Sequence, residues 1–312
     1  MHLIISSGDT NKRIDKFLSE LTTSEEMLNN LSRGDIIRQI KAAKVLVNDL
    51  KVKPSYRLNE GDELTLNIKE KKDKIIINSK VEIDVVYEDE NIVVINKEAG
   101  VQIHPDYNEK HITLLNGIVA KYPEILDIKE ENSHLPNLRP GVVHRLDKDT
   151  SGIVVIARNQ KVFNELKKMF QDREIEKKYL AIVYGTLVEK SGTIDKPLAR
   201  TSNYRRQTVA GKKTKTKIRE AVTEYKVSRE LEKNLSLLEV WPKTGRTHQI
   251  RVHLFSIGHP IVGDKLYKSK TIKKIPEVEK QLLHASEIKF TLFGEKYEFS
   301  AKEPDDFKYF LK

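Results

Sequence analysis

The densest group of side chains that could carry chemistry lies at 144–152, in the run His-Arg-Leu-Asp-Lys-Asp-Thr-Ser-Gly. Asp147 and Asp149 have the spacing of the first ligands in a calcium-binding EF-hand loop. The twelfth position of that loop should be a bidentate Glu, and here it is Arg158, a cation that would repel the metal. This excludes a calcium site of the EF-hand type.

Three interpretations of the two carboxylates stay open. An aspartyl-phosphate phosphatase also places two Asp residues two positions apart, but it has apolar residues where His144 and Arg145 precede Asp147, and no second acidic cluster for magnesium is evident. A metal-free catalytic carboxylate, kept ionised among Arg and His, fits these neighbours better. The third interpretation is a charged turn before a strand that starts at Gly152.

A second polar group lies at 243–254, Lys-Thr-Gly-Arg-Thr-His-Gln-Ile-Arg-Val-His-Leu, where a strand ends and a helix is expected to begin. A helix N-terminus with Thr, Gly and Arg collects anionic groups. His248 and His253 are five residues apart, whereas two zinc ligands on one helix face are four apart. We therefore expect no metal at this group or elsewhere in the chain.

A basic stretch at 203–219, called the basic arm below, contains seven Lys and Arg residues and no acidic residue. The chain of 312 residues has a formal net charge of +10, which favours nucleic acid, before anionic lipid, as its partner. In such a protein a long basic loop is typical of an arm that contacts phosphates. The residues expected to do so are Arg205, Arg206, Lys212, Lys213 and, in the second polar group, Arg246.

The composition excludes several classes of protein. The chain has no cysteine, which rules out disulfides, a thiol nucleophile and Cys-ligated metal sites, and which fits a reducing compartment such as the cytoplasm. The first residues lack the basic start and apolar run of a signal peptide, and no window approaches 18 uninterrupted apolar residues. We therefore expect a cytoplasmic protein without a membrane partner.

The elements that must position these residues fall into two segments, 1–69 and 81–312. The charged stretch at 70–80 between them is interpreted as a linker. The first segment is expected to be a small α/β module. Its expected elements are helices beginning at Arg13 and after a cap at Ser32, and strands at 45–49 and 63–68, with Asn-Asp and Glu-Gly-Asp as turns.

In the second segment, strands outnumber helices and do not alternate regularly with them, which predicts an α+β fold. A hairpin is expected from 81–87 and 92–96, and an amphipathic helix at 161–171. Further strands are expected at 152–157, 179–184, 221–227, 235–241 and 288–292.

Together these stretches resemble the RluA family of RNA pseudouridine synthases. The matching motifs follow the family order and lie at 87–90 with 94–97, 144–152, 178–181 with Gly185, 245–251, 258–264 and 283–285. Glu98 departs from the family, which commonly has Pro there. The resemblance implies the pseudouridine synthase fold, a mixed and mainly antiparallel sheet with a central catalytic cleft.

The resemblance also implies an activity, the conversion of uridine in RNA to pseudouridine without cofactor or metal. Asp147 matches the essential carboxylate, which would attack the ribose or the base, or abstract a sugar proton, before the freed uracil rejoins through carbon-5. Arg251 matches the residue that would pair with it and keep it ionised. Tyr179 would stack on the flipped base and assist proton removal from carbon-5. Arg145 and Leu146 would lie beside the vacancy that flipping leaves.

Residues 12–68 resemble the S4-like RNA-binding domain. Ala43 departs from its pattern, which usually has Gly there and leaves open how the chain turns after the second helix. The RNA-binding residues expected in this domain are Arg13, Lys16, Arg33, Lys44 and Lys51.

Two questions stay open at this point. The domain combination suits large-subunit ribosomal RNA, although members of the family also act on transfer RNA. A non-catalytic RNA-binding or ribosome-assembly protein could keep the same fold, but Asp147, Tyr179 and Arg251 together favour an enzyme. We expect the enzyme to be a monomer.

Overall fold

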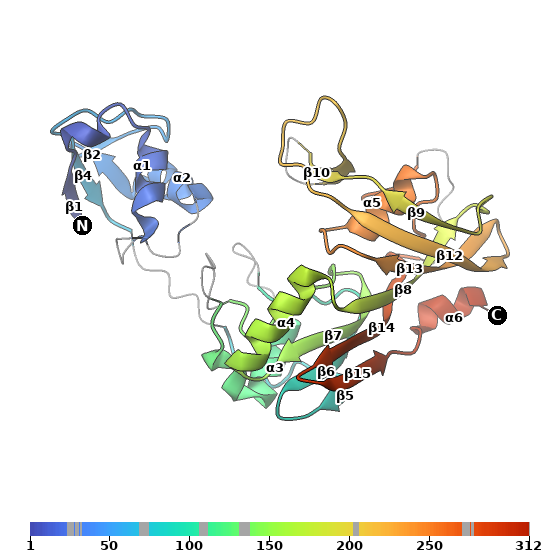
Figure 1. Ribbon diagram of the computed structural model, residues 1–312. Helices are drawn as coiled ribbons and strands as arrows, with labels where there is room; N and C mark the ends of the chain where they lie inside the picture. Colours follow the sequence, from blue (N-terminus) through green and yellow to red (C-terminus); the bar gives the residue numbers. More distant parts are fainter. Residues whose placement is uncertain are drawn as a thin grey trace. The chain divides into compact units, whose positions relative to one another are not determined.

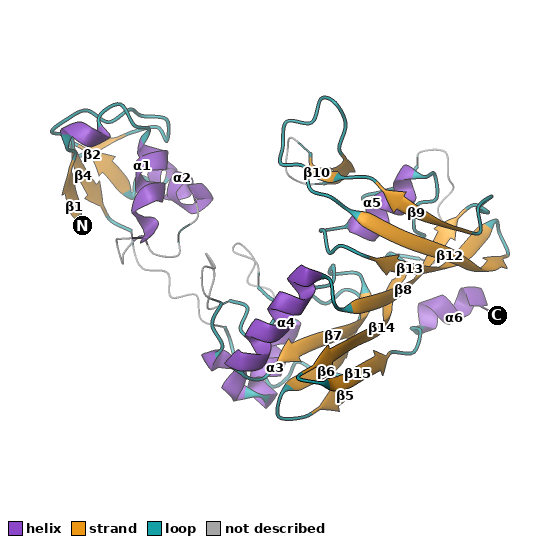
Figure 2. Cartoon of the chain, viewed as in Figure 1, coloured by secondary structure: helices purple, strands orange, loops and turns teal. Residues whose placement is uncertain are grey.

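The computed structural model describes residues 1–23, 28, 31, 33–68, 75–105, 112–130, 138–201, 206–269, 275 and 278–311 (Figure 1). The chain forms two compact units. The first comprises Met1–Ile75 with Lys129–Arg139, and the second comprises Ile76–Ile128 with Pro140–Lys312. Helices and strands occur in both units (Figure 2). No helix in the described part of the chain is long and apolar enough to cross a membrane.

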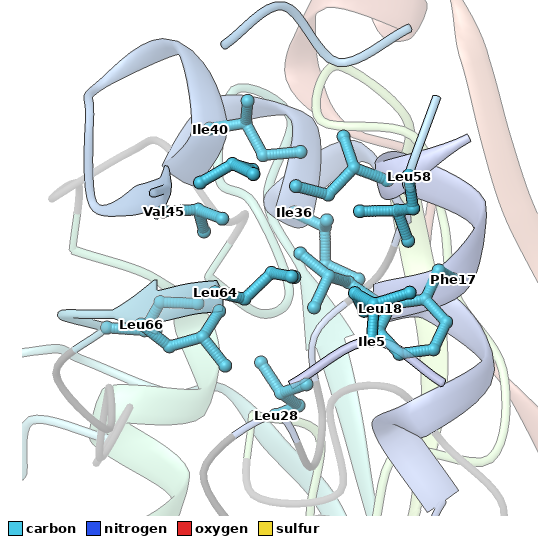
Figure 3. Close-up of a cluster of buried hydrophobic side chains, with 13 residues drawn as sticks. Ile5, Phe17, Leu18, Leu28, Ile36, Ile40, Val45, Leu58, Leu64 and Leu66 are labelled. Carbon is cyan, nitrogen blue, oxygen red and sulfur yellow. The ribbon is translucent and has the colours of Figure 1, made fainter. Parts of the chain in front are cut away.

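The first unit is an antiparallel sheet of four strands in the order β1-β4-β2-β3, with two α-helices. Side chains from helices and strands, among them Leu18, Ile36 and Leu64, form its buried core (Figure 3). The elements are β1 His2–Ile4, α1 Ile14–Glu20, α2 Arg33–Lys41, β2 Val45–Val47, β3 Leu50–Lys51 and β4 Glu63–Leu66, with 3₁₀ helices η1 Ser7–Asp9 and η2 Leu21–Thr23.

The predicted Asn-Asp turn is confirmed between β2 and β3. Asn48 and Asp49 both have left-handed backbone angles, with φ of 48° and 60°. Two consecutive left-handed residues match the right-handed twist of a two-residue hairpin, and Asn and Asp tolerate them better than other non-glycine residues. The predicted cap at Ser32 lies outside the described residues.

Helix α2 ends at Lys41, and Ala43 lies in the turn after it, at a position that is usually glycine. The Ala43 N–H donates to the carbonyl of Ile40 and the Lys44 N–H to that of Gln39, each at 3.0 Å. These two bonds require a left-handed residue between them, and Ala43 has φ of 55°. The departure from the S4 pattern therefore leaves the turn in place but puts a β-carbon where the backbone disfavours one.

We expect Ala43→Gly to raise the free energy of unfolding by roughly 0.5–1 kcal/mol, because it removes the strain of a left-handed alanine. Ala42→Gly is the matched control. Ala42 is not among the left-handed residues, so glycine there should lower the free energy of unfolding by a similar amount. Urea unfolding of the full chain, monitored through a signal that comes from the first unit, measures the free energy of unfolding of both variants. Changes of the same sign in the two variants would contradict the prediction.

The second unit is built on a sheet of nine strands, in the order β5-β6-β7-β14-β8-β13-β12-β9 with β15 paired to β14. Only the β7–β14 pairing in this sheet is parallel, among the described residues. The strands are β5 Val85–Glu88, β6 Ile92–Lys97, β7 Ser151–Ala157, β8 Glu176–Tyr184, β9 Ser191–Asp195, β12 Val222–Leu231, β13 Leu235–Pro242, β14 Leu283–Leu292 and β15 Glu295–Ser300. The predicted α+β class with a mainly antiparallel sheet is confirmed.

Helices and a small second sheet complete this unit. Helix α4 packs on β7, and α5 packs on β12 and β13 and contacts β11 (Figure 1). These elements are α3 Leu114–Lys121, η4 Pro123–Asp127, α4 Gln160–Asp172, α5 Gln249–Ser256 and α6 Asp305–Leu311, with β10 Leu198–Arg200 and β11 Gln207–Val209 paired antiparallel. Strand β11 lies in the basic arm.

The parallel contact between β7 and β14 depends on Gly152. This residue has φ of 111°, and a β-carbon on it would lie 2.2 Å from the carbonyl oxygen of Ala285 on β14. Every residue of β7 is buried. The strand therefore fixes the end of the 144–150 loop at the centre of the sheet.

Several elements were not predicted from the sequence. Strand β9 was missed because Ser-Gly-Thr-Ile-Asp offers a single apolar residue, Ile194, which is buried. Helices α3 and α6 and strands β10, β11 and β15 were also missed. Strand β14 begins at Leu283, earlier than predicted, and β5 begins only at Val85.

Candidate active site

Asp147 lies on the loop that leads into β7. Its backbone carbonyl accepts a hydrogen bond from the Thr150 N–H at 3.0 Å, which closes a turn, and Thr150 and Ser151 are buried. The Asp147 side chain is 18% exposed and lines a cavity of about 500 Å³. The carboxylate is thus held by a rigid loop and still faces open space.

Arg251 is the expected partner of Asp147, and the structure brings the two together. Arg251 Nη1 donates to Asp147 Oδ2 at 2.8 Å, while Nε and Nη2 donate to the two oxygens of Asp264 at 2.7 and 2.9 Å. Burial alone would lower the pKa of Arg251, but Asp264 and Asp147 outweigh it and raise the pKa. The guanidinium is therefore a fixed positive charge between two carboxylates.

Helix α5 holds Arg251 at the cavity, because other side chains of the helix pack in the core. Ile250 and Leu254 pack with buried residues of β8 and β13. The preceding loop is tied to the helix by Gln249, which was not predicted. Its Oε1 accepts from the Thr244 hydroxyl and the Arg246 N–H, at 2.6 and 3.0 Å, and its Nε2 donates to β12.

Tyr179 lies on β8 and lines the same cavity. Burial raises the pKa of its phenol, and the negative charge of Asp147 adds to the effect. The hydroxyl is therefore neutral in the physiological range.

His144 supports the loop and takes no part in proton exchange at neutral pH. The Val155 N–H donates to its Nε2 at 2.9 Å, and its ring stacks on Phe170 with a centroid distance of 4.7 Å. Burial, with a smaller contribution from Lys177, lowers its pKa to about 3. The side chain thus joins the Asp147 loop to β7 and α4 as a neutral ring.

Lys97 is a second support, and no motif in the sequence assigned it this role. It is 1% exposed, and its Nζ donates to the carbonyls of Glu98, Val101 and Lys148 at 2.8 to 3.0 Å. Burial lowers its pKa to about 7, although Asp149 and Asp147 act to raise it. Lys148 lies between these two aspartates in the sequence. The hydrogen bond from Lys97 Nζ to the Lys148 carbonyl therefore holds the loop that carries them.

This burial predicts a pH dependence of stability. An unfolded Lys has a pKa near 10.4, so between pH of about 7 and 10 the unfolded state binds one more proton than the folded state, and stability rises with pH. The free energy of unfolding of the wild type, relative to Lys97→Met, should increase by about 1.4 kcal/mol per pH unit across this window and stay flat below it. Urea unfolding from pH 5 to 9 measures the difference. Lys296→Met, at an exposed position on β15, is the matched control. The free energy of unfolding of the wild type relative to Lys296→Met should not change with pH in this window.

Lys177, two residues before Tyr179 on β8, was also missed. It lines the cavity, burial lowers its pKa, and its Nζ lies 5.6 Å from the centre of the Phe170 ring. Within the described residues it pairs with no carboxylate. A partly buried cation without a carboxylate partner is suited to an anionic ligand, and its period-two spacing from Tyr179 was the signal available in the sequence.

The other predicted residues of the second unit are distributed around this cavity. Arg145 and Leu146 both line it, Arg145 as an exposed residue and Leu146 as a buried one. Arg246 also lines it and donates through Nε to the carbonyl of Glu220 at 3.0 Å. Of the residues predicted in the basic arm, Arg206, Lys212 and Lys213 are exposed, and Arg205 lies outside the described residues.

In the first unit, two predicted RNA-binding residues form a local clamp. Arg13 and Arg33 donate to the fully buried Asp15 carboxylate at 3.0 and 2.8 Å. These bonds join the start of α1 to the start of α2, which is a structural role that the sequence pattern did not indicate. The remaining predicted residues, Lys16, Lys44 and Lys51, are exposed.

The described residues contain no group of three or more His, Asp or Glu side chains placed to hold a metal ion.

Comparison with known proteins bears on both units. The RNA pseudouridylate synthase family matches residues 91–256, and the S4 domain matches residues 12–64. An uncharacterized RNA pseudouridine synthase of Bacillus subtilis (strain 168) is 33% identical over 96% of this chain and 93% of its own length. The ribosomal large subunit pseudouridine synthase D of Vibrio cholerae serotype O1 is 31% identical over 97% of this chain and 91% of its own.

A solved structure agrees with these relatives. Human RNA Pseudouridylate Synthase Domain Containing 1 has a TM-score of 0.58 and 25% identity to this chain, and the match covers 73% of this chain and 86% of that one. Fold and relatives together define an isomerase that acts on RNA. The chain belongs to the RluA family of RNA pseudouridine synthases and carries an N-terminal S4 domain.

Proposed function

We propose that the enzyme converts uridines of large-subunit ribosomal RNA to pseudouridine and that Asp147 is its catalytic residue. The observation that carries the proposal is the Asp147 carboxylate, paired with Arg251 at 2.8 Å and facing the cavity that Tyr179 also lines. Relatives named ribosomal large subunit pseudouridine synthase D, together with the S4 domain, support ribosomal RNA as the substrate.

The reaction keeps all atoms of the nucleotide. The bond from N1 of uracil to C1′ of the ribose breaks, a bond from C5 to C1′ forms, and the proton of C5 is lost while N1 gains one. A stacked uridine cannot bring its C1′ to Asp147, so the target must leave the stack and enter the cavity. Arg145, exposed beside Asp147, is placed to fill the vacancy, whereas the buried Leu146 supports the loop.

Arg251 pairs with Asp147 and orients it, while its own Nε and Nη2 are held by Asp264. Tyr179 provides a surface on which the flipped base stacks. Its phenol is protonated at neutral pH, as an unshifted tyrosine also is. We assign Tyr179 the stacking role, and its part in removing the C5 proton stays a prediction.

Basic side chains around the cavity and on the S4 domain would bind the RNA backbone. Arg246 and Lys177 line the cavity, and Arg206, Lys212 and Lys213 of the basic arm are exposed. We assign residues 1–69 to RNA binding, 70–80 to the linker and 81–312 to catalysis. Each substitution that removes a phosphate-binding side chain should reduce the slope of log affinity against log salt by about 0.7–0.9.

The test is a map of pseudouridines in the cellular RNA of strains with and without the gene. We expect one or a few large-subunit positions to lose pseudouridine and to regain it with the wild-type gene but not with Asp147→Asn. If only transfer RNA lost pseudouridine, the substrate would be transfer RNA and not large-subunit ribosomal RNA. An unchanged map would favour a non-catalytic RNA-binding or ribosome-assembly role. The monomeric state and the cytoplasmic location stay predictions.

A further inference from the structure

A second line of contacts reaches Asp147 through His248 and Tyr267. His248, the residue before α5, has its Nε2 at 3.9 Å from Asp147 Oδ2, and its Nδ1 lies 2.9 Å from the hydroxyl oxygen of Tyr267. Tyr267 is buried, and the guanidinium of Arg251 lies 5.2 Å from the centre of its ring. The two side chains are thus packed around the Asp147–Arg251 pair.

The hydrogen bonds of Tyr267 favour one tautomer of His248. The backbone N–H of Gln207, in β11 of the basic arm, donates to the Tyr267 oxygen at 2.9 Å. An N–H can only donate, so this bond leaves the single hydroxyl hydrogen of Tyr267 free, and we assign it to His248 Nδ1. The neutral ring then carries its hydrogen on Nε2, the atom that faces Asp147. Burial lowers the pKa of His248, although Asp147 opposes this, which agrees with a neutral ring.

The backbone at His248 is held in an uncommon conformation. Its φ is 57°, in the left-handed region, directly after the loop that Gln249 ties to α5. A left-handed non-glycine residue without β-branching costs about 1–2 kcal/mol and persists where the surrounding structure requires it. Here the conformation places the imidazole between Tyr267 and Asp147.

We propose that His248 is a positioning residue for Asp147, donating from Nε2 to the carboxylate, and that Tyr267 orients it and connects it to the basic arm. The proposal rests on the proposed function of Asp147. The gap of 3.9 Å exceeds a hydrogen bond, and bonds of this kind commonly shorten only when the substrate binds. Because Gln207 lies in the basic arm, RNA bound there acts on the same chain of contacts.

Two substitutions at one position separate this role from folding. Asn tolerates the left-handed backbone best, but its short amide cannot reach Asp147, whereas the amide nitrogen of Gln reaches about as far as Nε2 of His. We therefore expect His248→Asn to keep the thermal stability of the wild type and to lose at least about tenfold in rate, and His248→Gln to stay within about threefold. Tyr267→Phe should slow the reaction by roughly three- to tenfold, since the proton is then no longer directed to Nε2. Tyr225→Phe, on β12, is its control.

The measurement is single-turnover tritium release, with enzyme in excess, from an unmodified large-subunit ribosomal RNA transcript whose uridines carry tritium at carbon-5. RNA affinity, measured separately, should change by less than about threefold in every variant. Equal rates for His248→Asn and wild type, equal losses for Asn and Gln, or a loss confined to affinity would each overturn the inference. An inactive wild type, or an active Asp147→Asn, would instead show that the proposed function is wrong, and the inference would fall with it.

Discussion

Replacing Asp147 by asparagine should abolish isomerisation and leave RNA binding nearly unchanged. Asparagine keeps the shape of the side chain and can still accept from Arg251, but it removes the carboxylate that the reaction requires. We expect the single-turnover rate at saturating RNA to fall at least about a thousandfold, a rise of about 4 kcal/mol in the barrier, while the dissociation constant changes by less than about threefold. Tritium release and filter binding on the same transcript measure the two quantities.

Asp149→Asn is the matched control, because Asp149 lies two residues further along the same loop. It is not paired with Arg251, and we expect it to retain more than about a tenth of the wild-type rate. An Asp147→Asn enzyme that also retained a tenth of the rate would remove Asp147 from the chemistry. If the rate fell further in Asp149→Asn than in Asp147→Asn, Asp149 would be the catalytic residue.

Of the single substitutions proposed for this protein, we expect Arg251→Met to lower the free energy of unfolding most. The substitution leaves two carboxylates without their partner, and the Asp264 side chain is only 1% exposed. Removing one member of a buried ion pair lowers the free energy of unfolding by about 3–5 kcal/mol. The rate should fall at least about a hundredfold, because Asp147 loses the charge that holds it. Urea unfolding and single-turnover rates measure the two losses.

A double variant separates the two effects. Arg251→Met with Asp264→Asn also removes the stranded buried charge and keeps an oxygen that accepts from the N–H groups of Leu266 and Tyr267, so we expect most of the stability to return while the rate stays low. Arg251→Lys keeps a positive charge but not the planar fork that contacts both aspartates, and it should be slow as well. Recovery of the rate together with the stability in the double variant would show that Arg251 acts on folding alone.

Much of the local structure could be predicted from the sequence. The apolar run at 152–157, the amphipathic helix at 161–171 and the Asn-Asp turn follow from patterns within a few residues, and each is present as β7, α4 and the β2–β3 hairpin. The order of strands and helices predicted the α+β class, and the family resemblance predicted the pseudouridine synthase fold, the S4 domain and the pairing of Asp147 with Arg251. It could do so because each motif is recognised by its own residues, even where the two residues that make a contact, such as Asp147 and Arg251, lie far apart in the chain.

Other features depend on contacts that no local pattern encodes. The parallel pairing of β7 with β14 brings Ser151 beside His284, and Lys97 reaches the carbonyl of Lys148 from a strand about fifty residues earlier. Arg13 and Arg33, predicted as phosphate ligands, also donate to a buried carboxylate that only the packing of α1 against α2 places between them.

The sequence alone therefore determined the chemical groups of this enzyme, its two segments and most of their helices and strands, because side-chain periodicity and turn chemistry act over a few residues. The tertiary structure decided what each group can do. It brought Tyr179 to the cavity that Asp147 lines, made Lys97 a buried support and made His248 the neighbour of Asp147, through burial and through contacts between residues far apart in the chain. Burial and such contacts set protonation and orientation, and neither can be read from spacing along the chain.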